Sequence, residues 1–238
     1  SEGVDVYAYP HNETSTGVTS PVYRVEAPDA LTLVDGTSIA GAAPVDLTQV
    51  DAYYFSLQKA LGSDGGLWVA VLSPATVERA RRVEERTDGR WVPQFLSLSA
   101  AIDNSRKDQT LNTPALATIV MAERQVRWLL ERGGIDAVSA HCTQASSLIY
   151  DWAEANLAAH PFVDNPAWRS PVTATIEINE AVSASELAAH LHARGIVDIG
   201  AYRGVGTNQL RIGTWPSVEV DDVEALLACI DYCLEHVL

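Results

Sequence analysis

The stretch DAYYFSLQKALGSDGGLWVAVLSPATVERARRVEER, residues 51–86, decides the fold class that the sequence predicts. Two apolar runs, DAYYFSL and LWVAVLS, have the length of buried strands, and a glycine-rich turn separates them. Ser73 and Pro74 then predict a helix start, because a hydroxyl caps the first turn and proline suits the first helical position. Strands that alternate with helices in this way indicate a parallel sheet covered by helices.

The same alternation continues on both sides of this stretch. Upstream, VDVYAYP (4–10) and ALTLVD (30–35) predict two more strands of the sheet. Downstream, we expect a helix that has Thr113 as its cap, Pro114 as its first residue and a glycine pair at its end. A third helix is expected over about residues 136–160. Together these elements predict one large α/β domain.

A change in composition marks a second domain. Residues 161–171, PFVDNPAWRSP, are rich in proline and predict a linker. After it we expect a strand over 172–178, a helix that starts with a Ser183–Glu186 capping box, strands over 195–202 and 209–215, and a terminal helix over 221–238. We therefore divide the chain into a large domain, residues 1–165, and a small C-terminal α+β domain, residues 166–238.

Composition limits the possible partners and locations. The net charge is −15, which argues against nucleic-acid binding, since phosphate backbones need a basic surface. No apolar run is long enough for a membrane span, and the first ten residues lack the pattern of a signal peptide. Three cysteines do not suggest a disulfide framework. We expect a cytoplasmic protein with no nucleic-acid or membrane partner.

The chain has only two lysines, and one of them stands at a strand end. Lys59 follows the predicted strand 51–57, and Asp35 ends the predicted strand 30–35. Ligands of open α/β sheets gather at the carboxyl ends of the strands. An amine for an aldehyde and an acid for a ring nitrogen are what pyridoxal phosphate requires. Each residue alone is more often a solvated surface lysine or a turn aspartate, so the pair carries the argument.

Four motifs together resemble the pyridoxal-phosphate-dependent phosphoserine aminotransferases, in a form close to the actinobacterial branch. They are HNETSTG (11–17), VDGTSIAG (34–41), SLQKALGSDGGLW (56–68) and NTP (112–114), in that order. The resemblance implies part of a fold-type-I aminotransferase domain, a mostly parallel sheet with flanking helices, and a small α+β domain. It implies amino-group transfer between L-glutamate and 3-phosphohydroxypyruvate, on the route to serine.

The resemblance also implies roles for individual residues. Lys59 would form the Schiff base with the cofactor, and Asp35 would pair with its pyridine nitrogen. Three further roles concern the rest of the cofactor: Thr14 would contact its phenolic oxygen, Gln58 its phosphate, and Asn112 and Thr113 the phosphate in the neighbouring subunit. A homodimer with shared sites follows from the last of these. The predicted helix start at Thr113 would favour a phosphate.

Two arginines of the small domain would bind the substrate. The resemblance assigns Arg211 to the α-carboxylate and Arg203 to the substrate phosphate, and arginine's planar fork suits both anions. The chain departs from the family pattern in having Tyr202 where many relatives have histidine. It also lacks the N-terminal segment that relatives carry before this region. We therefore expect the chain by itself to bind cofactor weakly and to have little activity.

Three alternatives stay open. An alanine–glyoxylate-type aminotransferase would use the same chemistry without the phosphate-binding arginine. A cysteine desulfurase needs a cysteine on a mobile loop, whereas Cys142, Cys229 and Cys233 fall in predicted helices. A non-catalytic fragment or assembly module would keep the fold alone. His190 and His192 are two apart, on different faces of a helix, so no metal site is expected.

Overall fold

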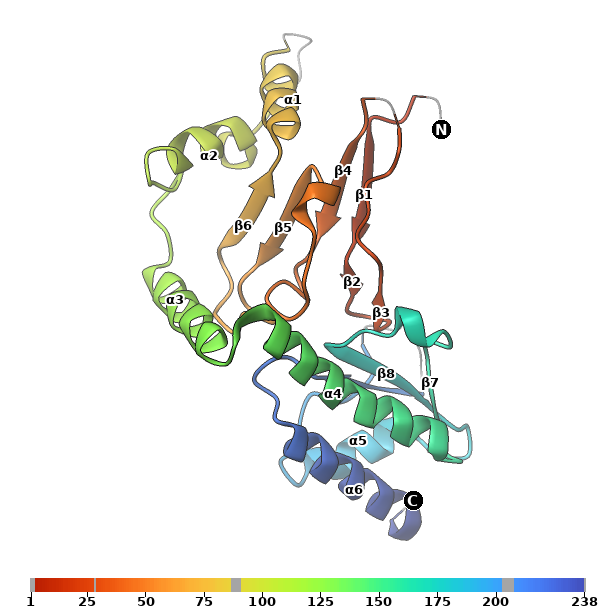
Figure 1. The fold of residues 1–238 in the computed structure, drawn as a ribbon. Helices are drawn as coiled ribbons and strands as arrows, with labels where there is room; N and C mark the ends of the chain where they lie inside the picture. Colours follow the sequence, from red (N-terminus) through yellow and green to blue (C-terminus); the bar gives the residue numbers. More distant parts are fainter. Residues whose placement is uncertain (1–2, 28, 87–90, 203–207, 238) are drawn as a thin grey trace.

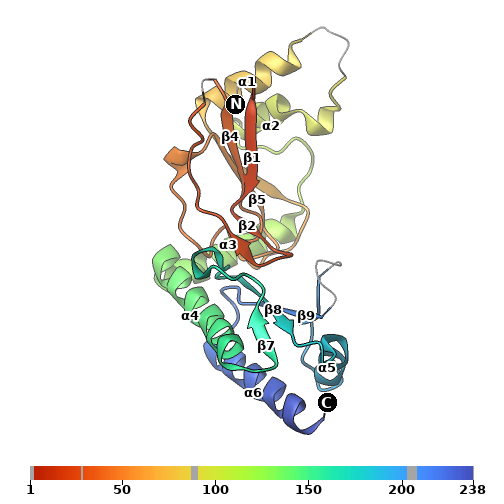
Figure 2. The same cartoon turned by 90° about the vertical axis from the view of Figure 1, so that its right-hand side faces the viewer.

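The structure is a computed structural model that describes residues 3–27, 29–86, 91–202 and 208–237. Figure 1 shows two lobes, a sheet lobe formed by the first part of the chain and a second lobe that ends with the C-terminus. Figure 2, turned by 90°, shows the sheet lobe standing on the second lobe. The two lobes meet below the sheet, and this junction holds the residues discussed below.

The sheet lobe contains four strands in one sheet. They are β1 (Val6–Pro10), β4 (Leu31–Asp35), β5 (Ala52–Ser56) and β6 (Trp68–Leu72), in the order β1-β4-β5-β6. β1, β4 and β5 run parallel, and β6 is antiparallel to β5. The four predicted strands are confirmed, and the sheet is mixed but mostly parallel. The arrowheads of β4 and β5 point towards the second lobe in Figure 1, so their carboxyl ends lie at the junction.

A small hairpin follows β1 at the same end of the sheet. Its strands are β2 (Asn12–Glu13) and β3 (Val18–Thr19), which pair antiparallel. The hairpin turn closes with a hydrogen bond from the N–H of Gly17 to the carbonyl of Glu13, 2.9 Å. A second bond, from the N–H of Ser170 to the carbonyl of Gly17, 2.9 Å, joins the hairpin to the second lobe.

Three α-helices belong to the sheet lobe: α1 (Pro74–Glu84), α2 (Leu98–Ser105) and α3 (Leu116–Glu131). α1 starts as predicted, with the Ser73 hydroxyl accepting from the N–H of Thr76. The predicted start of α3 is wrong. Its N-cap is Ala115, which is extended at φ −71° and ψ 95° and makes no side-chain cap. The chain therefore becomes helical only two residues after Pro114, and Thr113 does not cap α3.

The second lobe begins with a long helix and contains a three-stranded sheet. Its elements are α4 (Gly134–Ala155), β7 (Ala159–Pro161), β8 (Thr173–Ile178), α5 (Ala184–His192), β9 (Gln209–Gly213) and α6 (Val220–His236). Ser183 caps α5 as predicted. Two single-turn 3-10 helices lie in the sheet lobe, Leu47–Gln49 and Gln94–Leu96, and a third, Pro166–Trp168, precedes β8.

Two predictions for this lobe need correction. The helix expected to reach residue 160 ends at Ala155, because Asn156 is extended and residues 159–161 pair with β8. The strand expected over 195–202 does not form. Asp198 has a left-handed φ of 60°, which interrupts an extended chain, and only an isolated bridge joins Gly200 to Leu210.

The two faces of the β8–β9 sheet differ in chemistry because side chains alternate along a strand. Ala174, Ile176 and Leu210 on one face join a buried core with apolar residues of α4, α5 and α6. Thr175 and Arg211, which are register partners, lie on the other face. The hairpin packs closely here, since a Cβ on Gly17 would lie 3.1 Å from the Thr175 hydroxyl. The polar face of this sheet therefore faces the junction.

The core of the second lobe includes Ile149 and Ala153 of α4. This helix therefore packs with the elements that follow it in sequence, and a domain division between residues 165 and 166 stays a prediction. Among the helices of the described ranges, none combines the length and the hydropathy that crossing a membrane requires.

Candidate functional site

Asp35 and Lys59 come from neighbouring parallel strands. Asp35 is the last residue of β4, and its Oδ1 accepts the N–H of Thr37 at 2.8 Å. Within the described part of the chain, no hydrogen bond is made to the other carboxylate oxygen, Oδ2. Lys59 is half-buried three residues after the end of β5, in a turn that the N–H of Gly62 closes on the Lys59 carbonyl at 2.8 Å. The strand order thus brings an open carboxylate and an amine to one edge of the sheet.

A neutral pair of side chains packs beside Asp35. The Nδ1 of His11 and the hydroxyl of Tyr53 lie 3.1 Å apart, and both residues are buried. The N–H of His11 donates to the carbonyl of Asp35 at 2.8 Å. Burial lowers the pKa of His11 to about 4, and burial together with the charge of Asp35 raises the pKa of Tyr53. Neither side chain is therefore charged near neutral pH, which leaves Asp35 as the charged group at this point.

Gly36 makes this packing possible. A Cβ on Gly36 would lie 2.2 Å from the ring carbon Cζ of Tyr53, which no side chain tolerates. The glycine of the VDGTSIAG motif is thus required for a close approach between the loop after β4 and an aromatic side chain of β5.

The hairpin after β1 places Thr14 at the same edge of the sheet. Thr14 is the first residue of its turn. Next to it, the amide of Asn12 donates to the hydroxyl of Ser38 at 2.9 Å, and that hydroxyl donates back to the carbonyl of Asn12 at 3.1 Å. The hairpin is therefore bonded to the loop that carries Asp35.

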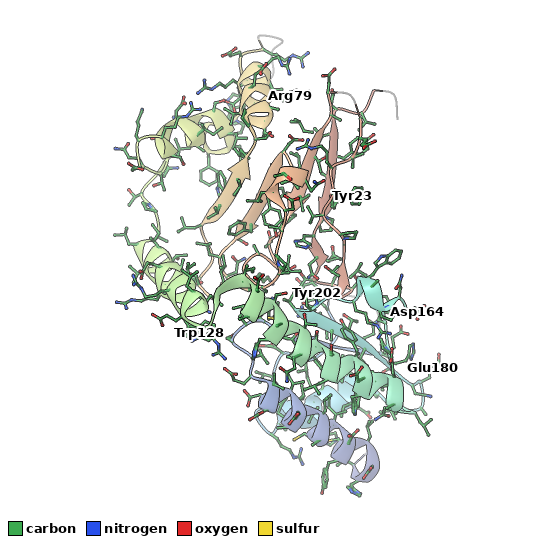
Figure 3. All side chains as sticks on the ribbon, in the orientation of Figure 1. Tyr23, Arg79, Trp128, Asp164, Glu180 and Tyr202 are labelled. Atoms are coloured by element: carbon green, nitrogen blue, oxygen red, sulfur yellow. The ribbon has the colours of Figure 1, made fainter. Side chains whose placement is uncertain are left out.

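Arg211 reaches the junction from the second lobe. Its guanidinium lies 4.3 Å from the ring centroid of Tyr202, a residue that Figure 3 labels where the two lobes meet. Burial lowers the pKa of Arg211, and its buried Nε has no hydrogen-bond partner among the residues that the structure describes. A partly desolvated guanidinium with an unused donor is suited to an anionic ligand. Arg203, the other predicted substrate-binding arginine, lies outside the described residues.

Trp215 links the two lobes directly at Lys59. The amine of Lys59 lies 5.8 Å from the centroid of the indole ring, and the indole N–H donates to the carbonyl of Ser38 at 3.1 Å. The site therefore joins the loop after β4, the turn after β5 and the segment after β9.

Three of the predicted site residues are exposed, and two of these three lie apart from Asp35 and Lys59. Gln58 is exposed beside Lys59. Asn112 and Thr113 belong to the segment between α2 and α3, which runs on the far side of β6 in Figure 1. They line a cavity of about 870 Å³ that includes none of Asp35, Lys59 and Arg211. Within one chain, then, the structure does not bring Asn112 and Thr113 to the other predicted residues.

A larger apolar groove, about 1060 Å³, also lies apart from this chemistry. Val69 and Val71 of β6 and Ile119, Val126 and Leu130 of α3 are among its lining residues. None of Asp35, Lys59 and Arg211 contributes to it, and we therefore locate the candidate site by the side chains at the strand ends.

Several side chains of the site were not singled out from the sequence, among them His11, Asn12, Ser38, Tyr53 and Trp215. The first three stand inside the motifs HNETSTG and VDGTSIAG, so the signal was present but was not assigned to them. Trp215 is one of six tryptophans and stands outside the four motifs. Only the position of β9 in space shows that this tryptophan contacts Lys59.

Both the sequence and the fold of this chain are similar to those of known aminotransferases. The sequence profile described as aminotransferase class-V matches residues 1–202. Phosphoserine aminotransferase of Corynebacterium glutamicum is 47% identical over 235 residues, and that of a Nocardioides species is 48% identical over 238 residues. These alignments cover 98% and 99% of this chain, and 62% and 63% of the two relatives. The chain thus spans less than two thirds of the length of the curated relatives it matches.

Among solved structures, a phosphoserine aminotransferase from Cytophaga hutchinsonii superimposes with a TM-score of 0.87. It is 22% identical, and the match covers 99% of this chain and 64% of that chain. At this identity the likeness concerns the fold. It confirms the predicted fold class, a mostly parallel sheet with flanking helices and a smaller α+β part.

Proposed function

Because the chain belongs to the class-V aminotransferase family, we propose that it carries the cofactor-binding lysine of a phosphoserine aminotransferase that uses pyridoxal phosphate. The proposed reaction transfers an amino group between L-glutamate and 3-phosphohydroxypyruvate, in the synthesis of serine. The observation that carries this proposal is the placement of Asp35 and Lys59 at the ends of adjacent strands, with Arg211 on the face of the β8–β9 sheet that packs against the hairpin after β1.

The residues present fit pyridoxal phosphate. The Lys59 amine suits its aldehyde, and the open carboxylate oxygen of Asp35 suits its ring nitrogen. Gln58 precedes Lys59 in sequence and is proposed to contact the phosphate. Thr14, on the hairpin that is bonded to the Asp35 loop, is proposed to contact the phenolic oxygen. When bound, the cofactor supplies an electron sink for the carbanion formed at the substrate α-carbon.

Asp35 and Lys59 have separate tasks in this mechanism. The Asp35 carboxylate keeps the ring nitrogen protonated, and the neutral His11–Tyr53 pair offers it no competing cation. The Lys59 amine is proposed to take the proton from the α-carbon of the amino-acid substrate, acting as a general base.

Arg211 and Arg203 are proposed to orient the substrate. The Arg211 guanidinium would bind the α-carboxylate. Its buried Nε, which has no partner within the described ranges, supports this role because a bound carboxylate would satisfy it. Arg203 would bind the phosphate of 3-phosphohydroxypyruvate and so separate this substrate from unphosphorylated ones. Tyr202, which stacks on Arg211, stands where many family members have histidine.

We also propose a homodimer with shared sites. Within one chain, Asn112 and Thr113 line a cavity that includes neither Asp35 nor Lys59, which supports a role for them at a partner subunit's cofactor phosphate. Because α3 begins two residues later than predicted, the N–H groups of its first turn do not extend to Thr113. A cytoplasmic location stays a prediction.

The proposal is tested by visible absorption of the protein mixed with pyridoxal phosphate, followed by addition of amino-acid substrates. We expect an absorption band that phosphoserine bleaches much faster than alanine does, and that Lys59→Ala lacks. Arg203→Ala should slow the reaction with phosphoserine far more than that with alanine. Arg194→Ala, an exposed arginine of the same lobe, is the matched control. Equal losses with both substrates would instead favour an alanine–glyoxylate-type enzyme.

Cysteine desulfurase chemistry gains no support. Cys142 and Cys233 are buried, and burial raises the pKa of Cys142 to about 12, so its thiolate is scarce near neutral pH. Cys229 is exposed, but it lies within α6 rather than on a loop.

A second candidate function, a non-catalytic assembly module, is favoured by the apolar groove. Such a module would self-associate but would take up no cofactor. Sedimentation analysis of the protein that showed a stable dimer, together with no absorption band from added pyridoxal phosphate, would support this candidate and contradict the first.

A further inference from the structure

Trp215 reaches from the second lobe to the amine of Lys59. It stands two residues after the end of β9 at Gly213, and its ring centroid lies 5.8 Å from the Lys59 Nζ. This distance is within the range in which an aromatic face attracts an ammonium group. Lysine otherwise carries its amine on a flexible four-carbon stem, so the ring restricts a group that would sample several rotamers.

The indole ring is itself held from several sides. Its N–H donates to the carbonyl of Ser38 at 3.1 Å. Gly213 leaves room for it, since a Cβ there would lie 2.4 Å from the ring carbon Cζ3. Thr214 fixes the backbone next to the ring, with its N–H on the carbonyl of Val172 and its hydroxyl on the carbonyl of Pro171, both at 2.9 Å. The ring therefore has a defined position before any ligand binds.

The ring also packs on the turn that carries Lys59. Trp215 is partly buried against an apolar cluster that includes Ile39, Leu57 and Ala60. Leu57 and Ala60 flank Lys59 in sequence, and Ile39 follows Ser38 in the loop after β4. One side chain thus contacts both the Asp35 loop and the Lys59 turn, and it belongs to the segment that carries Arg211 four residues earlier.

We propose that Trp215 is a positioning residue for Lys59, which holds the amine at the edge of the sheet where Asp35 ends its strand. The use of this contact in transamination rests on the proposed function, whereas the contact itself does not require a cofactor. Removal of the ring should change two rates in opposite directions, the rate of chemical labelling of Lys59 and the rate of cofactor attachment. A small reagent that acylates amines should react faster with Lys59 when the ring is removed, because the ring covers the amine. Cofactor attachment should become slower, because the amine is no longer held in place.

The first expectation is tested without cofactor by trace labelling with acetic anhydride. Peptide mapping gives the ratio of label on Lys59 to label on Lys107, the exposed second lysine of the chain, which serves as an internal reference. In Trp215→Leu this ratio should rise by about twofold to thirtyfold, the factor that corresponds to a lost cation–π contact. Trp215→Phe keeps a ring and should show a smaller rise. An unchanged ratio in Trp215→Leu would overturn the proposal.

Two controls separate positioning from general loosening of the fold. Trp128→Phe alters a tryptophan whose ring lies 4.6 Å from the guanidinium of Arg132, and it should leave the ratio unchanged. Thermal unfolding shows which variants are folded. Trp215→Met keeps an apolar side chain of similar reach without an aromatic face, and it replaces Trp215→Leu if that variant does not fold.

The second expectation is tested with pyridoxal phosphate and borohydride, which fixes the cofactor on the lysine to which it is bound. The rate of attachment to Lys59 should fall in Trp215→Leu by about the factor by which labelling rises, and Trp215→Phe should recover part of it. If the unsubstituted protein attaches no cofactor, the proposed function fails and the labelling ratio alone decides the role of Trp215. If attachment occurs at equal rates in all variants, the proposed function stands and the role of Trp215 is refuted.

Discussion

The two lobes differ in how completely they bury their apolar residues. In the second lobe, Ile176, Leu187 and Ile230 are fully buried, because the apolar face of β8–β9 packs on α4, α5 and α6. In the sheet lobe, Val71 of β6 is 45% exposed and Leu130 of α3 is 67% exposed. The comparison indicates that the second lobe is closed within this chain, whereas one side of the sheet is open. The candidate site lies between the two, at strand ends that are well fixed by hydrogen bonds.

The largest expected effect is on the closed lobe. Ile176→Ala should lower the free energy of unfolding by about 2–5 kcal/mol, because it leaves a cavity in a packed core. Val71→Ala, its counterpart on the open sheet, should cost less than about 1 kcal/mol, because half of that side chain is already in water. Urea unfolding followed by circular dichroism measures both. Similar costs for the two variants would show that the open face is covered in solution.

The next effect is specific to the sheet lobe and depends on pH. The pKa of His11 is lowered to about 4 in the folded protein, from 6.5, because burial disfavours the imidazolium. Between these values the unfolded chain binds more protons, so stability falls as the pH drops from 6.5 to 4 and then levels off. The loss is on the order of 3 kcal/mol.

Hydrogen exchange at pH 7 and pH 5 checks this pH effect in each lobe. Amides of β4 and β5 should lose protection at the lower pH, and amides of β8 should change less. His11→Phe should remove the pH-dependent part of the loss. A uniform loss across both lobes would contradict the assignment to His11.

A smaller effect is expected at the loop that carries Asp35. Gly36→Ala should cost about 1–3 kcal/mol, because its methyl group would overlap the Tyr53 ring and force the loop to move. Gly65→Ala is a matched control in the same lobe, since a Cβ there meets nothing within 4 Å. The control should be near neutral. Thermal unfolding measures both variants, and equal melting temperatures would mean that the loop does not depend on this contact.

The smallest effect on stability is expected on the open face itself. Leu130→Gln changes a side chain that is 67% exposed and lines the apolar groove. It should alter the free energy of unfolding by no more than about 0.5 kcal/mol. It should also weaken self-association measured by light scattering, because exposed apolar patches drive association. A large loss of stability without any change in association would contradict an open groove.

Much of this fold could be predicted because its signals are local. The four strands of the sheet are apolar runs between turn residues, and Ser73–Pro74 marks a helix start by side-chain and ring chemistry alone. The predictions that are wrong concern segments whose composition suggests one structure while the backbone adopts another. Thr113–Pro114 has the composition of a helix start, but the backbone stays extended through Ala115. Residues 195–202 are apolar enough for a strand, but Asp198 takes a left-handed conformation that no composition rule requires.

For the candidate site, the sequence could predict only the arrangement that follows from the order of the strands. Asp35 and Lys59 could be paired because parallel strands end at one edge of a sheet. The contact between Trp215 and Lys59 could not, because the two residues are far apart in sequence and depend on how the second lobe packs. The same holds for the His11–Tyr53 pair, which forms only because β1, β4 and β5 are adjacent.

We propose above that Asp35 and Lys59 form one cofactor site at the junction of the two lobes. Borohydride reduction of the protein with pyridoxal phosphate, followed by peptide mapping, tests it most directly. We expect attachment to Lys59 and not to Lys107, and a strong loss of attachment in Asp35→Ala. Attachment to both lysines to the same extent, or attachment to Lys59 that is indifferent to Asp35→Ala, would contradict it.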